Sequence, residues 1–151
     1  HFIIRDQSAQ RTIGGGRVID PYSPNRGRAR PNRLVTLKSM RYDRPQLILQ
    51  ALAEKSLTGV ELYNFSIRHN IPTHDLDKLI TSLNLRQIGK ATGKLAFCQE
   101  RWHELLNLVL TSVREFHLSK SKLLGPSIKD VQLLLKPYLD VETLKIVLDK
   151  V

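Results

Sequence analysis

Cysteine and aromatic residues are scarce in this sequence. Its 151 residues include one cysteine and one tryptophan, and aromatic side chains make up 6%. The single thiol, Cys98, excludes a disulfide within the chain and fits a reducing compartment. We expect Cys98 to pack as a small apolar side chain.

Long apolar runs are missing too. No stretch approaches the roughly 20 apolar residues that a membrane span needs, and no signal peptide is visible. The hydrophobic fraction of 41% is nevertheless sufficient for a packed core. We expect a globular, monomeric, cytoplasmic protein with no membrane partner. Because the sequence opens directly on strand-forming residues and stops within a periodic segment, we also expect a fragment of a longer chain.

Catalytic and phosphate-binding patterns are scarce as well. Three glycines, Gly14 to Gly16, precede Arg17-Val18-Ile19-Asp20-Pro21, which favours a strand over the helix start that a phosphate loop needs. His103-Glu104 lacks the second histidine of a zinc-binding HExxH helix, because Asn107 stands in its place. We expect no catalytic residue, no cofactor and no metal in this chain.

Positive charge is present in excess and is concentrated near the amino terminus. The net charge is +10, and residues 1 to 42 carry nine Lys/Arg against two Asp/Glu. The densest part holds four arginines, Arg26, Arg28, Arg30 and Arg33. Such a cluster suits nucleic-acid phosphates, because guanidinium groups pair with them and release counterions. A solvated linker explains the composition equally well.

Apolar spacing predicts helices over about 31–40, 44–55, 58–70 and 73–83. Thr58-Gly59-Val60-Glu61 matches a capping box, and Thr73 is a good N-cap. The faces expected to be buried include Leu47, Ile48, Ala51, Leu52, Leu76, Leu79, Ile80 and Leu83. Two strands then follow over 85–89 and 94–98, separated by a turn. Helices followed by a hairpin are typical of a winged helix.

The pattern restarts after a longer helix predicted from 100 to about 117, which carries Trp102 on its apolar face. Ser127 and Asp140 are expected to cap two further helices, as in a second winged helix that ends before its wing. Near the amino terminus, residues 1–5 and 12–20 predict strands. The predicted fold class is α+β and mostly α, with tandem winged-helix modules after the strands.

The third helix of each predicted module is not basic, which argues against strong DNA binding. Their exposed candidates are His74, Asp75, Asp77, Lys78, Thr81, Ser82 and Asn84 in the first module and Glu142, Thr143, Lys145, Asp149 and Lys150 in the second. The hairpin is better supplied with cations. The predicted nucleic-acid-binding residues are therefore Arg26, Arg28, Arg30, Arg33, Arg86, Lys90 and Lys94.

The first strands carry a family resemblance. Phe2-Ile3-Ile4-Arg5-Asp6, and then Arg11-Thr12-Ile13-Gly14-Gly15-Gly16-Arg17-Val18-Ile19, resemble the closing strands of the third, β-barrel domain of elongation factor Tu, although Asp20 stands where that factor has a lysine. The continuation is similar to the bacterial selenocysteine-specific elongation factor. The residues that resemble the junctions between the segments of that factor are Asp20-Pro21, the Arg26 to Arg33 cluster, Trp102, Phe116-His117 and Gly125.

This resemblance implies four segments: closing barrel strands (1–22), an Arg/Pro-rich connector with a short helix (23–43), a first winged helix (44–99) and a truncated second one (100–151). It implies the central part of a factor that delivers selenocysteyl-tRNA to the ribosome at a recoded UGA codon. The parent protein would be a translational GTPase that uses GTP and magnesium in an upstream domain. Modules after residue 151 would bind an mRNA hairpin.

Two other functional classes stay open. A winged-helix DNA-binding transcription regulator would share the helical order but would have no reason to begin with barrel strands. A protein-interaction scaffold would differ from a translation factor in titrations with tRNA and with ribosomes.

The first prediction concerns nucleotides. We expect no measurable GTP binding or hydrolysis by this chain, because it contains no phosphate loop, no Walker lysine and no acid placed to hold magnesium. Isothermal calorimetry with GTP and magnesium checks this expectation, and a saturable heat of binding would contradict it.

Overall fold

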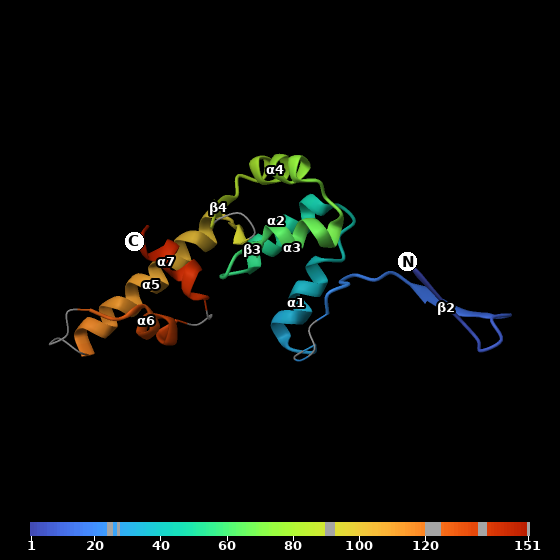
Figure 1. The fold of residues 1–151 in the computed structure, drawn as a ribbon, viewed down its shortest axis with the longest axis horizontal. Coiled ribbons are helices and arrows are strands. Elements are labelled where there is room, and N and C mark those ends of the chain that lie inside the picture. The colour runs from blue at the N-terminus through green and yellow to red at the C-terminus, as the bar shows by residue number, and fades with distance from the viewer. Residues whose placement is uncertain (24–25, 27, 90–92, 120–124, 136–138, 151) are drawn as a thin grey trace. The chain divides into compact units, whose positions relative to one another are not determined.

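The structure is a computed structural model that describes residues 1–23, 26, 28–89, 93–119, 125–135 and 139–150. These residues form an α+β fold that is mostly helical, as the sequence predicted at this level (Figure 1). The chain divides into two compact units, His1–Asp43 and Arg44–Val151.

The first unit opens with an antiparallel hairpin of β1 (Phe2–Arg5) and β2 (Thr12–Gly16), which has a bulge between Ile4 and Arg5. Both strands were predicted, but β2 ends at Gly16 and does not reach Pro21. The close approach of the β1 backbone requires a glycine at Gly15, whereas Gly16 faces only the end of a side chain. A Cβ atom on Gly15 would lie 2.7 Å from the carbonyl oxygen of Phe2, and one on Gly16 would lie 2.9 Å from the Phe2 ring.

The glycines therefore serve strand pairing, and the described residues 17–23 that follow them are not helical. The first helix, α1 (Pro31–Ser39), has Pro31 in its first turn, where a missing N–H costs no helical hydrogen bond. It ends with the Ser39 hydroxyl donating to the carbonyl oxygen of Val35 at 3.2 Å. These bounds agree with the predicted helix over 31–40.

The second unit begins with helices and a three-stranded sheet. In chain order its elements are α2 (Pro45–Lys55), β3 (Val60–Glu61), α3 (Leu62–His69), α4 (Thr73–Ser82), β4 (Arg86–Ile88) and β5 (Leu95–Phe97). β5 lies between β3 and β4 and is antiparallel to both. The helices and the hairpin strands were predicted, whereas β3 was not.

The predicted capping box at Thr58 is wrong. Glu61 is the N-cap of α3 and its side chain makes no capping hydrogen bond, because Val60 and Glu61 pair with β5 instead. Gly59 allows this pairing: its φ is +78°, and a Cβ atom there would lie 2.6 Å from the Phe97 ring. Thr73 is likewise not a cap but the first residue of α4, after Pro72.

The buried face of α2 is also shifted from the predicted stripe. Ile48 and Ala51 are buried as expected, but Leu47 is 44% exposed and Leu52 is only partly buried. Leu49 and Ala53 are fully buried in their place. The reason is tertiary, since α2 contacts the strands β3 and β5 and also a later helix, α5 (Gln99–Ser119).

The last three helices are α5 (Gln99–Ser119), α6 (Ile128–Leu134) and α7 (Val141–Leu148). Both predicted caps are confirmed: Ser127 and Asp130 form a capping box, and Asp140 Oδ1 accepts from the Thr143 backbone N–H at 2.9 Å. Burial works to raise the pKa of Asp140, but hydrogen bonds from Thr143 outweigh it and the pKa lies below its usual value.

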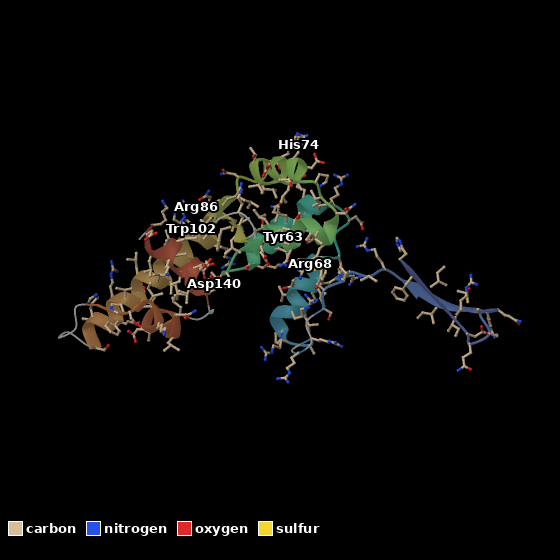
Figure 2. The ribbon with its side chains drawn as sticks, viewed as in Figure 1. Tyr63, Arg68, His74, Arg86, Trp102 and Asp140 are labelled. Carbon is tan, nitrogen blue, oxygen red and sulfur yellow. The ribbon has the colours of Figure 1, made fainter. Side chains whose placement is uncertain are left out.

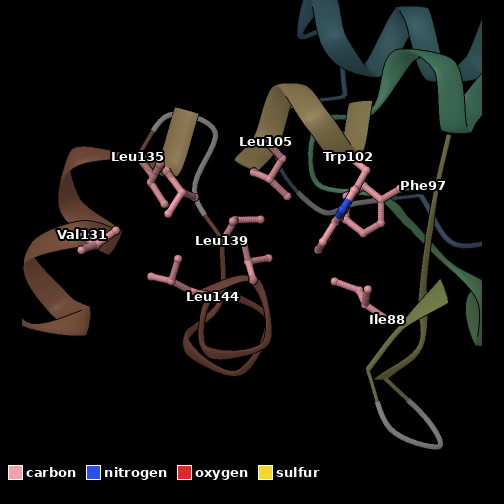
Figure 3. Close-up of a cluster of buried hydrophobic side chains, with 10 residues drawn as sticks. Ile88, Phe97, Trp102, Leu105, Val131, Leu135, Leu139 and Leu144 are labelled. Carbon is pink, nitrogen blue, oxygen red and sulfur yellow. The ribbon is translucent and has the colours of Figure 1, made fainter. Parts of the chain in front are cut away.

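One buried cluster joins the β4–β5 hairpin to these helices (Figure 3). Trp102 belongs to this cluster, is 1% exposed and meets the Phe97 ring edge-on, with ring centroids 5.5 Å apart. The cluster comprises Ile88, Phe97, Trp102, Leu105, Val109, Val131, Leu135, Leu139, Leu144 and Val147. The hairpin and the carboxy-terminal helices therefore share one core.

A second prediction tests the packing of α4. Ile80 is 2% exposed, so Ile80→Asp should lower the free energy of unfolding by more than about 3 kcal/mol, because it places a charge in the core. The matched control is Thr81→Asp at the exposed neighbouring position, which should change stability by less than about 1 kcal/mol. Urea unfolding followed by circular dichroism measures both. Equal midpoints for the two variants would contradict the packing of α4.

Candidate nucleic-acid interface

The predicted arginines of the first unit do not share one environment. Arg26, Arg28 and Arg30 are exposed. Arg33, in α1, is different: its Nη2 lies 2.5 Å from Asp20 Oδ2, and the two side chains are only 16% and 2% exposed. Its positive charge is directed to a carboxylate of the same unit.

The acidic residues of the first unit all have partners within it. The unit carries nine Lys/Arg against three Asp/Glu. Asp43 Oδ1 lies 3.3 Å from Arg17 Nη1, and Asp6 Oδ1 accepts from two backbone N–H groups in the hairpin turn. The three carboxylates of this unit, Asp6, Asp20 and Asp43, each contact groups of the same unit. The excess positive charge is displayed to solvent, where it can attract phosphates.

Of the three cations predicted in the hairpin of the second unit, Arg86 contacts an aromatic ring. The Arg86 guanidinium carbon lies 4.7 Å from the centroid of the Trp102 ring, and Figure 2 shows the two residues side by side. This stacking is a cation–π contact that connects β4 to α5. Lys94 is exposed next to β5, whereas Lys90 lies outside the described residues.

The third helices of the two predicted modules are weakly charged surfaces. On α4, Asp75 Oδ1 lies 3.6 Å from Lys78 Nζ and 3.3 Å from His74 Nδ1, so the exposed Lys78 ammonium faces a carboxylate. On α7, Thr143 was expected to be exposed, but it is buried because its hydroxyl donates to the capping residue Asp140 at 2.5 Å. Neither helix presents the positive face that a groove reader needs.

Other site chemistry is sparse. Within the described ranges, no three His, Cys, Asp or Glu side chains are grouped so that they could hold a metal ion. None of the helices in this part of the chain is long and apolar enough to cross a membrane. The Cys98 thiol donates to the carbonyl oxygen of Ala53 at 3.5 Å, and burial raises its pKa, which makes it a poor nucleophile.

Comparison with known protein families, with curated proteins and with solved structures gives no match. Any functional assignment therefore depends on the residues themselves. Two contacts matter here that the sequence did not reveal, Asp20–Arg33 and Arg86–Trp102. Their partners are 13 and 16 positions apart and follow no helical or strand period, so no local signal in the sequence could have found them.

A third prediction separates the two cations of the hairpin. Arg86→Ala should lower the free energy of unfolding by about 0.5–1 kcal/mol and shift the emission of Trp102 to longer wavelength, because the ring loses its stacked guanidinium. Lys94→Ala, the exposed control, should change neither quantity. Trp102 is the only tryptophan, so its fluorescence reports this contact directly. Identical spectra for Arg86→Ala and the parent protein would rule out the stacking in solution.

Proposed function

We propose that this chain is the central part of a selenocysteine-specific translation elongation factor. It would link the GTPase and tRNA-binding part of that factor to the part that binds an mRNA hairpin during UGA recoding. The observation that carries the proposal is the β1–β2 hairpin, whose sequence resembles the closing strands of an elongation-factor barrel and whose surface is that of a sheet fragment.

The hairpin exposes a set of large apolar side chains: Phe2 at 45%, Ile3 at 67%, Ile4 at 50% and Ile13 at 67%. Ile3 and Ile4 are neighbours in β1, so their side chains point to opposite faces. A two-stranded hairpin is at best marginally stable in water and does not normally expose apolar residues on both faces. This supports the proposal that β1 and β2 belong to a larger β-barrel, whose other strands would come from the preceding part of the parent protein.

The second unit supports the helical half of the proposal. The order α2, α3, α4, β4, β5 suits a first winged helix, with the left-handed residue Asn70 (φ 50°) at the turn between α3 and α4. We assign α5, α6 and α7 to a second module. Because α4 and α7 are not basic, both modules would act as spacers that set the distance between bound tRNA and the mRNA hairpin.

RNA contact would then belong to the connector of the first unit. Arg26, Arg28 and Arg30 are exposed, closely spaced and part of a unit with a net positive charge. Guanidinium groups in this setting recognise phosphates without reading base sequence. The chain itself would perform no catalysis. GTP and magnesium would bind an upstream domain of a cytoplasmic, monomeric parent protein.

A fourth prediction concerns the salt dependence of RNA binding. Replacing Arg26, Arg28 and Arg30 together with alanine should reduce the slope of log affinity against log salt by about 2 to 3 units, at roughly 0.7 to 0.9 per phosphate contact. Fluorescence anisotropy with labelled tRNA and with an RNA hairpin, measured over a salt series, gives the slope. Preference among RNA sequences should barely change.

The control for this experiment is a variant of α4 in which His74, Lys78, Thr81 and Ser82 become alanine. It should bind RNA nearly as well as the parent protein, since α4 is assigned a spacer role. An unchanged slope in the arginine variant together with lost affinity in the α4 variant would favour a DNA-reading regulator. Absence of binding to tRNA and to ribosomes would favour a protein-interaction scaffold. A GxxxxGK[ST] loop in the parent reading frame would support the translational GTPase.

A further inference from the structure

Arg86 differs from Arg33 and Arg101 in where its charge is directed. Those two arginines are only partly exposed, and each pairs with a carboxylate, that of Asp20 or of Glu104. Arg86 is partly buried as well, but within the part of the chain that the structure describes its guanidinium forms no hydrogen bond and no ion pair. It is held instead by the ring of Trp102 (Figure 2). No carboxylate in the described ranges balances its charge.

A contact with the face of an aromatic ring leaves the hydrogen-bonding capacity of a guanidinium group intact. The five N–H donors of arginine lie in the guanidinium plane and point outward from its rim. Cation–π attraction acts through the flat face of the group instead. Arg86 therefore keeps its donors while the ring restrains the side chain. The residue is partly exposed, which leaves room for an external acceptor.

The charge around Arg86 favours a phosphate polymer as the source of that acceptor. A guanidinium fork pairs with the two oxygens of a carboxylate or of a phosphate. The second unit carries fifteen Lys/Arg against eleven Asp/Glu, so it has a positive net charge, as the first unit does. Such a chain attracts polyanions from solution. A phosphate of a nucleic-acid backbone therefore fits better than an isolated carboxylate.

We propose that Arg86, held on the Trp102 ring, is a preoriented ligand for one phosphate group of the RNA backbone. This inference rests on the proposed function, because that function supplies RNA as the source of the phosphate. It adds one contact to those assigned to the connector and leaves α4 a spacer. Restraint by the ring reduces the side-chain entropy that Arg86 loses on binding, so one residue contributes measurably to affinity.

The emission of Trp102 tests this proposal directly, since Trp102 is the only tryptophan of the chain. A phosphate that pairs with the stacked guanidinium changes the charge next to the ring. Addition of a short RNA hairpin, corrected for its absorption, should therefore change the emission saturably. Inorganic phosphate should do the same at higher concentration, whereas potassium chloride of equal ionic strength should not. If Arg86 only covers the ring, none of these additions should change the emission.

Substitutions of Arg86 test the same contact by affinity. Arg86→Ala should weaken binding of the labelled hairpin roughly threefold to tenfold and reduce the slope of log affinity against log salt by about 0.7 to 0.9, the value of one phosphate contact. Arg86→Lys keeps the charge but loses the flat fork, so it should retain the slope and lose less affinity. Circular dichroism checks that both variants are folded.

The matched control is Arg114→Ala, which removes one positive charge from an exposed position of the same unit. Arg114 lies twelve residues after Trp102 in α5, or about 18 Å along the helix. It is not stacked on that ring, so Arg114→Ala should leave both the slope and the response of Trp102 as in the parent protein.

A saturable response of Trp102 to the hairpin and to phosphate, with a reduced slope in Arg86→Ala and not in Arg114→Ala, supports the proposal. An unresponsive tryptophan, or equal slopes for these two variants, overturns it and leaves Arg86 a packing residue. A response to inorganic phosphate alone, or a stronger response to duplex DNA than to RNA, overturns RNA as the ligand.

The triple variant of Arg26, Arg28 and Arg30 keeps the two failures apart. If it binds RNA like the parent protein while Trp102 still responds, the RNA contact assigned to the connector fails and the proposal for Arg86 holds. If it loses its salt slope as expected while Arg86→Ala behaves like Arg114→Ala, the proposed function stands and the proposal for Arg86 is overturned.

Discussion

The packing of Trp102 is the interaction on which the larger unit depends. Its ring is 1% exposed, lies edge-on to Phe97 of β5 and is covered by the Arg86 guanidinium from β4. It stands in the first turn of α5, and the same helix continues through Leu105 and Val109 to the cluster formed with α6 and α7. A hairpin that could have been a solvated wing is thereby fixed to a helix.

Charge is organised differently in the first unit, where burial matters more than the number of arginines. Asp6, Asp20 and Asp43 each accept from groups of the same unit, but only Asp20 does so while almost inaccessible to water. A carboxylate in that position holds a cation firmly. One of four clustered arginines is therefore structural, while Arg26, Arg28 and Arg30 remain exposed. A count of basic residues alone therefore overstates the number of exposed guanidinium groups in this segment.

Local signals made most elements predictable. Ser127 and Asp140 begin helices because their side chains satisfy backbone N–H groups within the next turn. Thr58 fits the same rule but does not cap a helix, because the backbone of Val60 and Glu61 pairs with β5 and α3 begins only at Leu62. The buried face of α2 was misplaced for a similar reason, since packing on two sides buries Leu49 and leaves Leu47 exposed. In each failure a contact distant in sequence outweighed a local preference.

By itself, the sequence determined the order of the helices and of strands β1, β2, β4 and β5, the basic character of the first unit and the need for small residues in β2, because these depend on side-chain chemistry and short-range spacing. Only the tertiary structure decided which cationic side chains are exposed to solvent. Arg33 and Arg86 have the same side chain as Arg26 and Arg28, yet one is paired with a buried carboxylate and the other is stacked on an indole ring. No local pattern marks Asp20 or Trp102 as the partner, since each contact arises only when the chain folds back on itself.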